Sequence, residues 1–68
     1  MRYRIDTHDS WGRVKVGEFQ TLEEARHSYA QICQDPWYRS DGTVLGVELL
    51  EDNGSGMQQR LDWFSFQP

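Results

Sequence analysis

The chain has 68 residues, a formal net charge of −4 and a single cysteine. A chain of this length forms one small domain, spanning residues 1–68, whose core is too small for a separate catalytic domain or a large closed pocket. The acidic balance disfavours general nucleic-acid binding, which usually depends on a basic domain.

Two short segments near the start alternate between polar and apolar side chains. Residues 2–8 and residues 13–16 show this alternation, which predicts two half-buried strands. The turn residues between them, 9–12, join the strands into a hairpin. When inward-facing residues are paired with one another, Asp6 lies opposite Lys15, and we expect a cross-strand ion pair there.

The alternation breaks at the end of the second strand. Phe19 is apolar but out of phase with the residues before it. We therefore expect a β-bulge at Gly17 and Glu18, opposite Arg4, that returns Phe19 to the core beside Tyr3.

A helix is predicted next, over residues 22–34, from apolar side chains at helical spacing. Thr21 and Glu24 form a capping box: the Thr21 hydroxyl accepts from the Glu24 amide, and the Glu24 carboxylate reaches back to the Thr21 amide. Pro36 disfavours a helical residue before it, so the helix ends there. We expect the following segment, 35–42, to be a loop that holds two aromatic residues.

A second hairpin follows the loop. Residues 44–50 and 58–66 predict two strands, and the Gly-rich residues 52–56 predict the turn between them. We expect Glu51 to pair with Met57. The chain then reads β-β-α-β-β, which is an α+β fold with an antiparallel sheet and one helix packed on one face.

The register of this hairpin decides which side chains are exposed. It places Trp63 on the core face, and it places Glu48 opposite Arg60 as an ion pair on the outer face, with Asp62 nearby. Four apolar side chains then lie on that outer face: Val44, Leu50, Phe64 and Phe66. Either a partner covers them, or the segment 35–42 or a chain terminus folds over them, and the sequence leaves both readings open.

No pattern of catalytic or metal-binding residues emerges. Asp6, His8 and Asp9 lie close in sequence, but structural zinc needs four ligands, usually Cys and His at recognisable spacings. Cys33 and His27 lie about 240° apart around the helix, so they cannot form a catalytic dyad. We therefore expect no enzyme activity, no metal site and no cofactor.

The aromatic residues carry the leading functional hypothesis. Three Trp, three Tyr and three Phe exceed the needs of a small two-layer core. Exposed aromatic residues beside acidic ones are typical of protein-binding surfaces. The expected binding residues are Trp37, Tyr38, Glu48, Asp62, Phe64 and Phe66. We expect a non-enzymatic inhibitor or adaptor whose partner is a protein, for example in a nucleic-acid-handling complex; a homodimer through this face or an edge strand is a version of the same reading.

Nucleic-acid binding through the first hairpin is the alternative hypothesis. Residues 1–16 carry a net charge of +2, whereas residues 17–68 carry −6. A two-stranded ribbon with basic side chains can enter a groove of DNA. The residues expected to bind are Arg2, Arg4, Trp11, Arg13 and Lys15.

Residues 16–25, which read Val-Gly-Glu-Phe-Gln-Thr-Leu-Glu-Glu-Ala, are followed by Tyr29. This segment resembles the strand-to-helix junction of AP2-type DNA-binding domains and integrase arm-binding domains. Those families read DNA with Arg and Trp side chains on the sheet, so the resemblance implies that role for the first hairpin. In size and charge the chain is also similar to small phage-encoded inhibitors, anti-CRISPR proteins among them, which implies a viral origin and an inhibitory role.

The cellular setting follows from composition. Cys33 has no partner for an internal disulfide, which favours a reducing, cytoplasmic compartment. The charged, alternating start of the chain is unlike a signal peptide. The apolar runs are far shorter than a membrane span, so we expect no membrane insertion.

Overall fold

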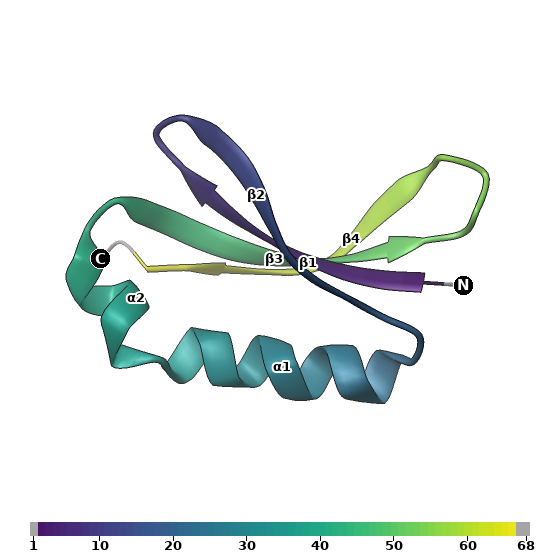
Figure 1. Ribbon diagram of the computed structural model, residues 1–68, viewed down its shortest axis with the longest axis horizontal. Coiled ribbons are helices and arrows are strands. Elements are labelled where there is room, and N and C mark those ends of the chain that lie inside the picture. Colours follow the sequence, from purple (N-terminus) through teal and green to yellow (C-terminus); the bar gives the residue numbers. More distant parts are fainter. Residues whose placement is uncertain (1, 67–68) are drawn as a thin grey trace.

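A computed structural model describes residues 2–66 as a four-stranded antiparallel sheet with a long helix packed on one face (Figure 1). The elements in chain order are β1 (Arg2–Asp9), β2 (Gly12–Phe19), α1 (Leu22–Gln34), α2 (Pro36–Asp41), β3 (Val44–Asp52) and β4 (Gln58–Ser65). The strand order is β2-β1-β3-β4, so β2 and β4 form the two edges. The predicted α+β fold is confirmed. Within the described part of the chain, neither helix has the length and apolar character needed to cross a membrane.

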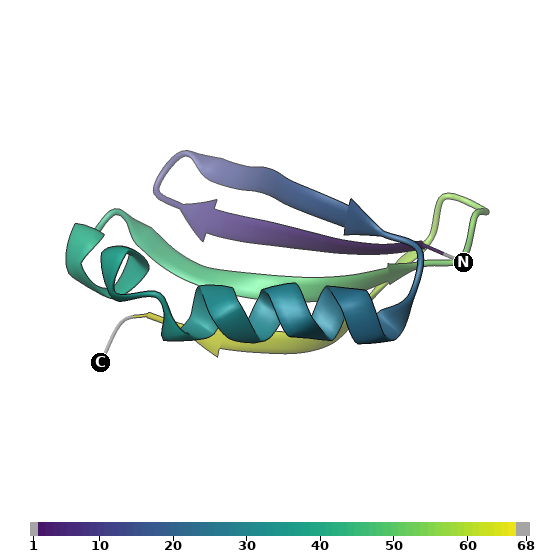
Figure 2. The ribbon, with the colours of Figure 1, turned by 60° about the horizontal axis from the view of Figure 1, so that its bottom comes forward.

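The two hairpins form one sheet, and α1 forms a second layer on one face of that sheet. Both hairpin turns curve away from α1 in Figure 1. Figure 2 shows α1 running roughly along the strands and across one face of the sheet. We call the opposite face the outer face.

The helix α1 has the bounds that the sequence predicted. Thr21 has an extended backbone and caps it, because its hydroxyl oxygen accepts from the Glu24 amide at 3.2 Å. The second half of the predicted capping box is wrong. The Glu24 carboxylate accepts from the Thr21 hydroxyl, at 2.9 Å, rather than from the Thr21 amide. A hydroxyl can donate one hydrogen bond while accepting another, so the same side chain serves both contacts.

The core lies between α1 and the two central strands. Five buried residues form it: Ile5, Ala25, Tyr29, Val47 and Leu49. Ala25 and Tyr29 are four residues apart and therefore share one face of α1. Seven half-buried side chains pack around this cluster: Tyr3, Phe19, Ile32, Cys33, Leu61, Phe64 and Phe66.

The first hairpin contains a bulge, but its predicted position at Gly17 and Glu18 is wrong. Phe19 lies opposite Tyr3 and packs against the core, as predicted. The residue without a partner is Val16, whereas Gly17 and Glu18 pair regularly with β1. The bulge restores the phase of Phe19 because one extra residue reverses which face the later side chains occupy.

The cross-strand ion pair of this hairpin does not form. Asp6 does lie opposite Lys15, as predicted. However, Lys15 pairs with Glu18, with Nζ 2.7 Å from Oε1, and Asp6 is held by Arg4 and Arg13. Two guanidinium groups give the buried carboxylate several hydrogen bonds, which a single ammonium group cannot match.

The predicted register of the second hairpin is wrong. Glu51 lies opposite Gln59 rather than Met57. Gly54 and Gly56 both have positive φ, at 85° and 86°, which lets the turn take in five residues before β4 begins. The turn has five residues, as predicted, but it lies at 53–57, one residue further along the chain, so the partner of Glu51 moves by two residues.

A bulge exchanges the two faces of the later part of β4, because Leu61 has no partner on β3 and one extra residue reverses the faces of the residues after it. Phe64 lies opposite Val47 and packs against the core with Phe66, so their predicted place on the outer face is wrong. Trp63 lies opposite Glu48 and belongs to the outer face, so its predicted core position is also wrong. This bulge is a further one in the sheet, besides the bulge at Val16 in β2.

The segment predicted as a loop contains the short helix α2. Asp35 has an extended backbone, which ends α1, and its side chain accepts from the Trp37 amide at 2.9 Å, which caps α2. Pro36 occupies the first turn, where its missing amide hydrogen carries no penalty. Gly42, with φ of 77°, ends the helix. Tyr38 of α2 stacks on Phe66, with ring centroids 5.5 Å apart, so α2 covers the end of the core.

Candidate binding surface

The outer face carries a layer of charged side chains over two carboxylates. Asp6 and Glu48 lie opposite each other on adjacent strands, and both are buried although no helix covers this face. Four side chains lie over them: Arg4, His8, Arg13 and Arg60. The carboxylates are therefore buried by arginine and histidine side chains rather than by a second layer of the fold.

Asp6 is held by two arginines. Arg4 donates to it through Nε at 2.7 Å and through Nη2 at 3.0 Å, and Arg13 donates through Nη2 at 2.8 Å. Burial opposes the ionised form, but these hydrogen bonds outweigh it and lower the pKa of the Asp6 carboxyl below its ordinary value. The Arg4 pKa is raised by the same hydrogen bond.

Glu48 has three partners. Its Oε1 lies 2.7 Å from His8 Nε2 and 3.4 Å from Arg13 Nε, and its Oε2 accepts from Arg60 Nε at 2.8 Å. Burial again opposes ionisation, and hydrogen bonds from His8 and Arg60 lower the pKa of the Glu48 carboxyl. The predicted pair of Glu48 and Arg60 is confirmed, but as a diagonal contact. Its predicted exposure is wrong, because the Glu48 side chain is buried.

Trp63 closes one side of this layer. Its ring meets His8 edge to face, with centroids 5.0 Å apart, and Arg60 lies 5.0 Å above it. Gly46 lies beneath the indole, and a Cβ there would come within 2.4 Å of the ring. The absence of a side chain at position 46 is what makes room for Trp63.

The residues predicted for nucleic-acid binding are mostly engaged within the chain. Each basic member contacts a carboxylate: Arg2 and Lys15 contact Glu18, and Arg4 and Arg13 contact Asp6. Trp11 is 89% exposed at the tip of the first hairpin. The structure therefore brings Arg4 and Arg13 together on a carboxylate and leaves Trp11 apart from them.

The residues predicted for protein binding are dispersed. Glu48, Phe64 and Phe66 are placed as described above, away from free surface. Asp62 faces the helix side and lies 3.8 Å from Arg26 of α1, so its predicted position on the outer face is wrong. Trp37 is 60% exposed and meets the half-buried Tyr38 edge to face. These two aromatic residues remain as a candidate binding pair.

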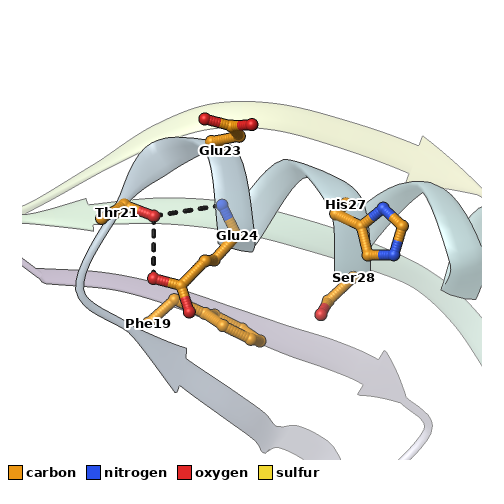
Figure 3. Close-up of a pocket in the computed structure, with 6 residues that line it drawn as sticks. All are labelled: Phe19, Thr21, Glu23, Glu24, His27 and Ser28. Atoms are coloured by element: carbon orange, nitrogen blue, oxygen red, sulfur yellow. Dashed lines mark hydrogen bonds between the residues drawn. The ribbon is translucent and has the colours of Figure 1, made fainter.

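Two adjoining hollows lie between α1 and the edge strand β2. One has a volume of about 460 Å³ and is lined by Phe19, Thr21, Glu23, Glu24, His27 and Ser28 (Figure 3). The second has a volume of about 340 Å³ and is lined by Ile5, Val16, Phe19, Ser28, Gln31, Ile32, Asp35 and Tyr38. Because they share Phe19 and Ser28, we treat them as one groove, the α1–β2 groove.

The α1–β2 groove has an apolar floor and acidic ends. Figure 3 shows one end, where Phe19 comes from the end of β2 and Glu23 and Glu24 come from the first turn of α1. Asp35 lies at the other end, beside Tyr38. Among residues 2–66, none of these three carboxylates forms an ion pair with a cationic side chain.

The margin of the groove exposes two β-branched side chains of β2. Val14 is 52% exposed and Val16 is 44% exposed. The sequence predicted both as core residues, because they alternate with Arg13 and Lys15. They remain uncovered because α1 packs mainly under the central strands and β2 is an edge. The alternation within β2 predicts on which face of the sheet a side chain lies, but not how far that side chain lies from α1.

Among residues 2–66, the remaining reactive side chains form no candidate catalytic or metal site. Cys33 is half-buried against the core, and burial raises the pKa of its thiol. Burial likewise raises the pKa of the Tyr29 hydroxyl. Within residues 2–66, no group of three or more His, Cys, Asp or Glu side chains is placed to hold a metal ion.

The likeness to AP2-type and integrase arm-binding domains is limited to the junction of β2 and α1. Those families place three strands before the helix, whereas here two strands precede α1 and two follow it. The likeness therefore does not extend to the order of elements. When the whole chain is compared with protein-family models, curated proteins and solved structures, none of them matches.

Proposed function

We propose that this chain is a non-enzymatic interaction module that holds a segment of a protein partner in the α1–β2 groove. The observation that carries the proposal is the exposure of Val16, which lines the apolar floor of the groove, and of Val14 two residues earlier on the same edge strand. Exposed apolar side chains that adjoin a hollow mark protein-binding sites more often than scattered single residues do. Trp37, at the Tyr38 end of the groove, supplies an aromatic anchor.

The distribution of charged side chains indicates which kind of partner would bind. The outer face has an excess of positive charge, because five of the seven basic side chains lie there with three carboxylates: Arg2, Arg4, Arg13, Lys15 and Arg60 with Asp6, Glu18 and Glu48. The net charge of −4 therefore resides mainly elsewhere, including the ends of the groove. A basic partner surface complements it and would speed association at low salt. An inhibitor or adaptor of a cytoplasmic nucleic-acid-handling complex fits this chemistry, because such complexes present basic surfaces.

Site-directed photocrosslinking tests the proposal. Benzoylphenylalanine replaces Val16 at the groove or, as a control, Met57, which is exposed on the second hairpin. After irradiation in a nuclease-treated lysate of the source organism, we expect one protein adduct at position 16 and none at position 57. The Glu24→Gln variant should weaken the adduct, and the matched Glu51→Gln variant should not. Equal labelling at both positions, or none at position 16, contradicts the proposal.

Nucleic-acid binding is the second candidate. It is favoured by the gathering of five basic side chains and Trp63 on the outer face, with Trp11 exposed at the hairpin tip. It predicts that a labelled DNA duplex binds with an affinity that falls steeply with salt and is lost in Trp11→Ala. Binding that is absent at low salt excludes this candidate and leaves the groove proposal unaffected.

A further inference from the structure

The edge strand β2 has the features of a site for an added strand. It spans Gly12–Phe19 and pairs on one side only, with β1. Alternate N–H and C=O groups of such a strand point away from the sheet without a partner, and a further strand can pair with them. The other edge, β4, differs because its helix-side residues Leu61 and Phe64 already pack against the core.

Side chains on both sides of β2 define what an added strand would meet. Val16 lines the groove, Val14 is exposed two residues before it, and Arg13 and Lys15 lie on the outer side. Acidic side chains stand at the two ends of the groove. The β2 strand is about 26 Å long, which matches six to eight extended residues of a partner.

We propose that the α1–β2 groove takes an extended peptide segment that pairs antiparallel with β2, directs every second, apolar side chain towards α1, and carries Lys or Arg at both ends. This inference rests on the proposed function, and it specifies how the partner binds. Main-chain hydrogen bonds to β2 supply part of the affinity, and the apolar side chains set the register. The Lys or Arg residues complement Glu24, which points towards Phe19 in Figure 3, at one end and Asp35 at the other.

A second copy of this chain is a poor occupant. Antiparallel self-pairing of β2 centred on Val14 sets Arg13 opposite Lys15, and self-pairing centred on Lys15 sets that residue opposite its own copy. Like charges directly opposite each other destabilise a strand pair. Lysine on an edge strand is also a common protection against self-association.

Peptide selection followed by backbone methylation tests the inference. Random ten-residue peptides displayed on phage are selected on the full chain and counter-selected on the folded Val14→Glu, Val16→Glu variant. We expect the enriched peptides to alternate apolar and polar residues, with basic residues at the ends. The highest-affinity peptide is then synthesised with a single N-methyl group at each position in turn.

Methylation separates strand addition from other modes of binding. It should lower affinity by about tenfold at every second residue, because it removes a donor to β2, and it should change affinity little at the residues between. A loss without this alternation, a bound peptide that is helical by NMR, or no enriched peptide overturns the inference. A dimer of the free chain in sedimentation overturns it as well. A groove adduct in the photocrosslinking experiment with no alternation in the methylation series rejects strand addition and leaves the proposed function standing.

Discussion

Glu48 lies directly opposite Asp6 on the outer face, so two buried carboxylates face each other across β1 and β3. Two like charges in such a place would repel each other strongly. Arg13 contacts both, at 2.8 Å from Asp6 and 3.4 Å from Glu48. Arg13 also reaches Gln58, with a 3.5 Å contact, and so connects the two hairpins across the outer face.

Removing Arg13 should therefore destabilise the fold more than an ordinary surface arginine would. Arg13→Met keeps most of the aliphatic stem and removes the charge from between Asp6 and Glu48. Because the Arg13 side chain is 45% exposed, we expect a loss of about 2 kcal/mol in the free energy of unfolding, below the cost of breaking a fully buried pair. Urea denaturation monitored by circular dichroism measures it.

Arg2→Met is the matched control for Arg13→Met. Arg2 is on the same face, but its side chain is 74% exposed and its contact with Glu18 is 3.9 Å. We expect no measurable change in stability for this variant. Equal effects of the two substitutions would show that the carboxylate pair does not depend on Arg13.

The same carboxylates set the response to acid. Asp6 and Glu48 have pKa values below their ordinary values of 3.8 and 4.5 in the folded chain. A carboxyl with a lowered pKa contributes stability that is fully present above the ordinary value and is lost as the pH falls through the folded-state value. We expect the free energy of unfolding to decrease as the pH falls below about 4, most steeply where these two groups take up protons.

Two measurements check the acid response. Carboxyl-carbon NMR titration should place the midpoints of Asp6 and Glu48 below the ordinary values of 3.8 and 4.5. Asp6→Asn should flatten the loss of stability at low pH, whereas Glu23→Gln should leave it unchanged. Ordinary midpoints for both buried groups would refute the prediction.

Gly46 should tolerate no side chain. A Cβ at this position would lie 2.4 Å from the Trp63 ring and 2.7 Å from the Phe64 carbonyl oxygen. Gly46→Ala must therefore displace the indole and the backbone of β4, and we expect a loss of about 2–3 kcal/mol in stability. In a Trp63→Ala background the added methyl should cost less, because only the Phe64 contact remains. An equal cost in both backgrounds would show that the ring does not limit this position.

Patterns among residues close in sequence were sufficient to predict the four strands and α1 in their correct order, although not the short helix α2. The alternation in the first hairpin, the cap at Thr21 and the break at Pro36 each depend on neighbours in sequence, and the bounds of α1 followed from them. The shape of the second hairpin does not depend on neighbours alone. Its turn lies one residue later than predicted, and the bulge at Leu61 exchanges the faces of the residues after it; no residue pattern in β4 marks the position of that bulge.

The candidate site was harder to predict, because it depends on strand order. Val14 and Val16 have the pattern of core residues, and they are exposed only because β2 is an edge that α1 does not cover. Asp6 and Glu48 have the pattern of surface residues, and they are buried because arginines from β1, β2 and β4 converge on them. Each exception is set by contacts between elements distant in sequence.

Thr21 should contribute to stability through its hydroxyl rather than its size. It accepts from the Glu24 amide and donates to the Glu24 carboxylate, so both hydrogen bonds require the oxygen. Thr21→Ala should lower the free energy of unfolding by about 1 kcal/mol, whereas Thr21→Ser should change it little. Glu24→Gln should have a smaller effect than Thr21→Ala, because the backbone contact to Thr21 survives. Thermal denaturation of the three variants checks this order, and an equal loss in the alanine and serine variants would show that the methyl group, not the cap, stabilises the start of α1.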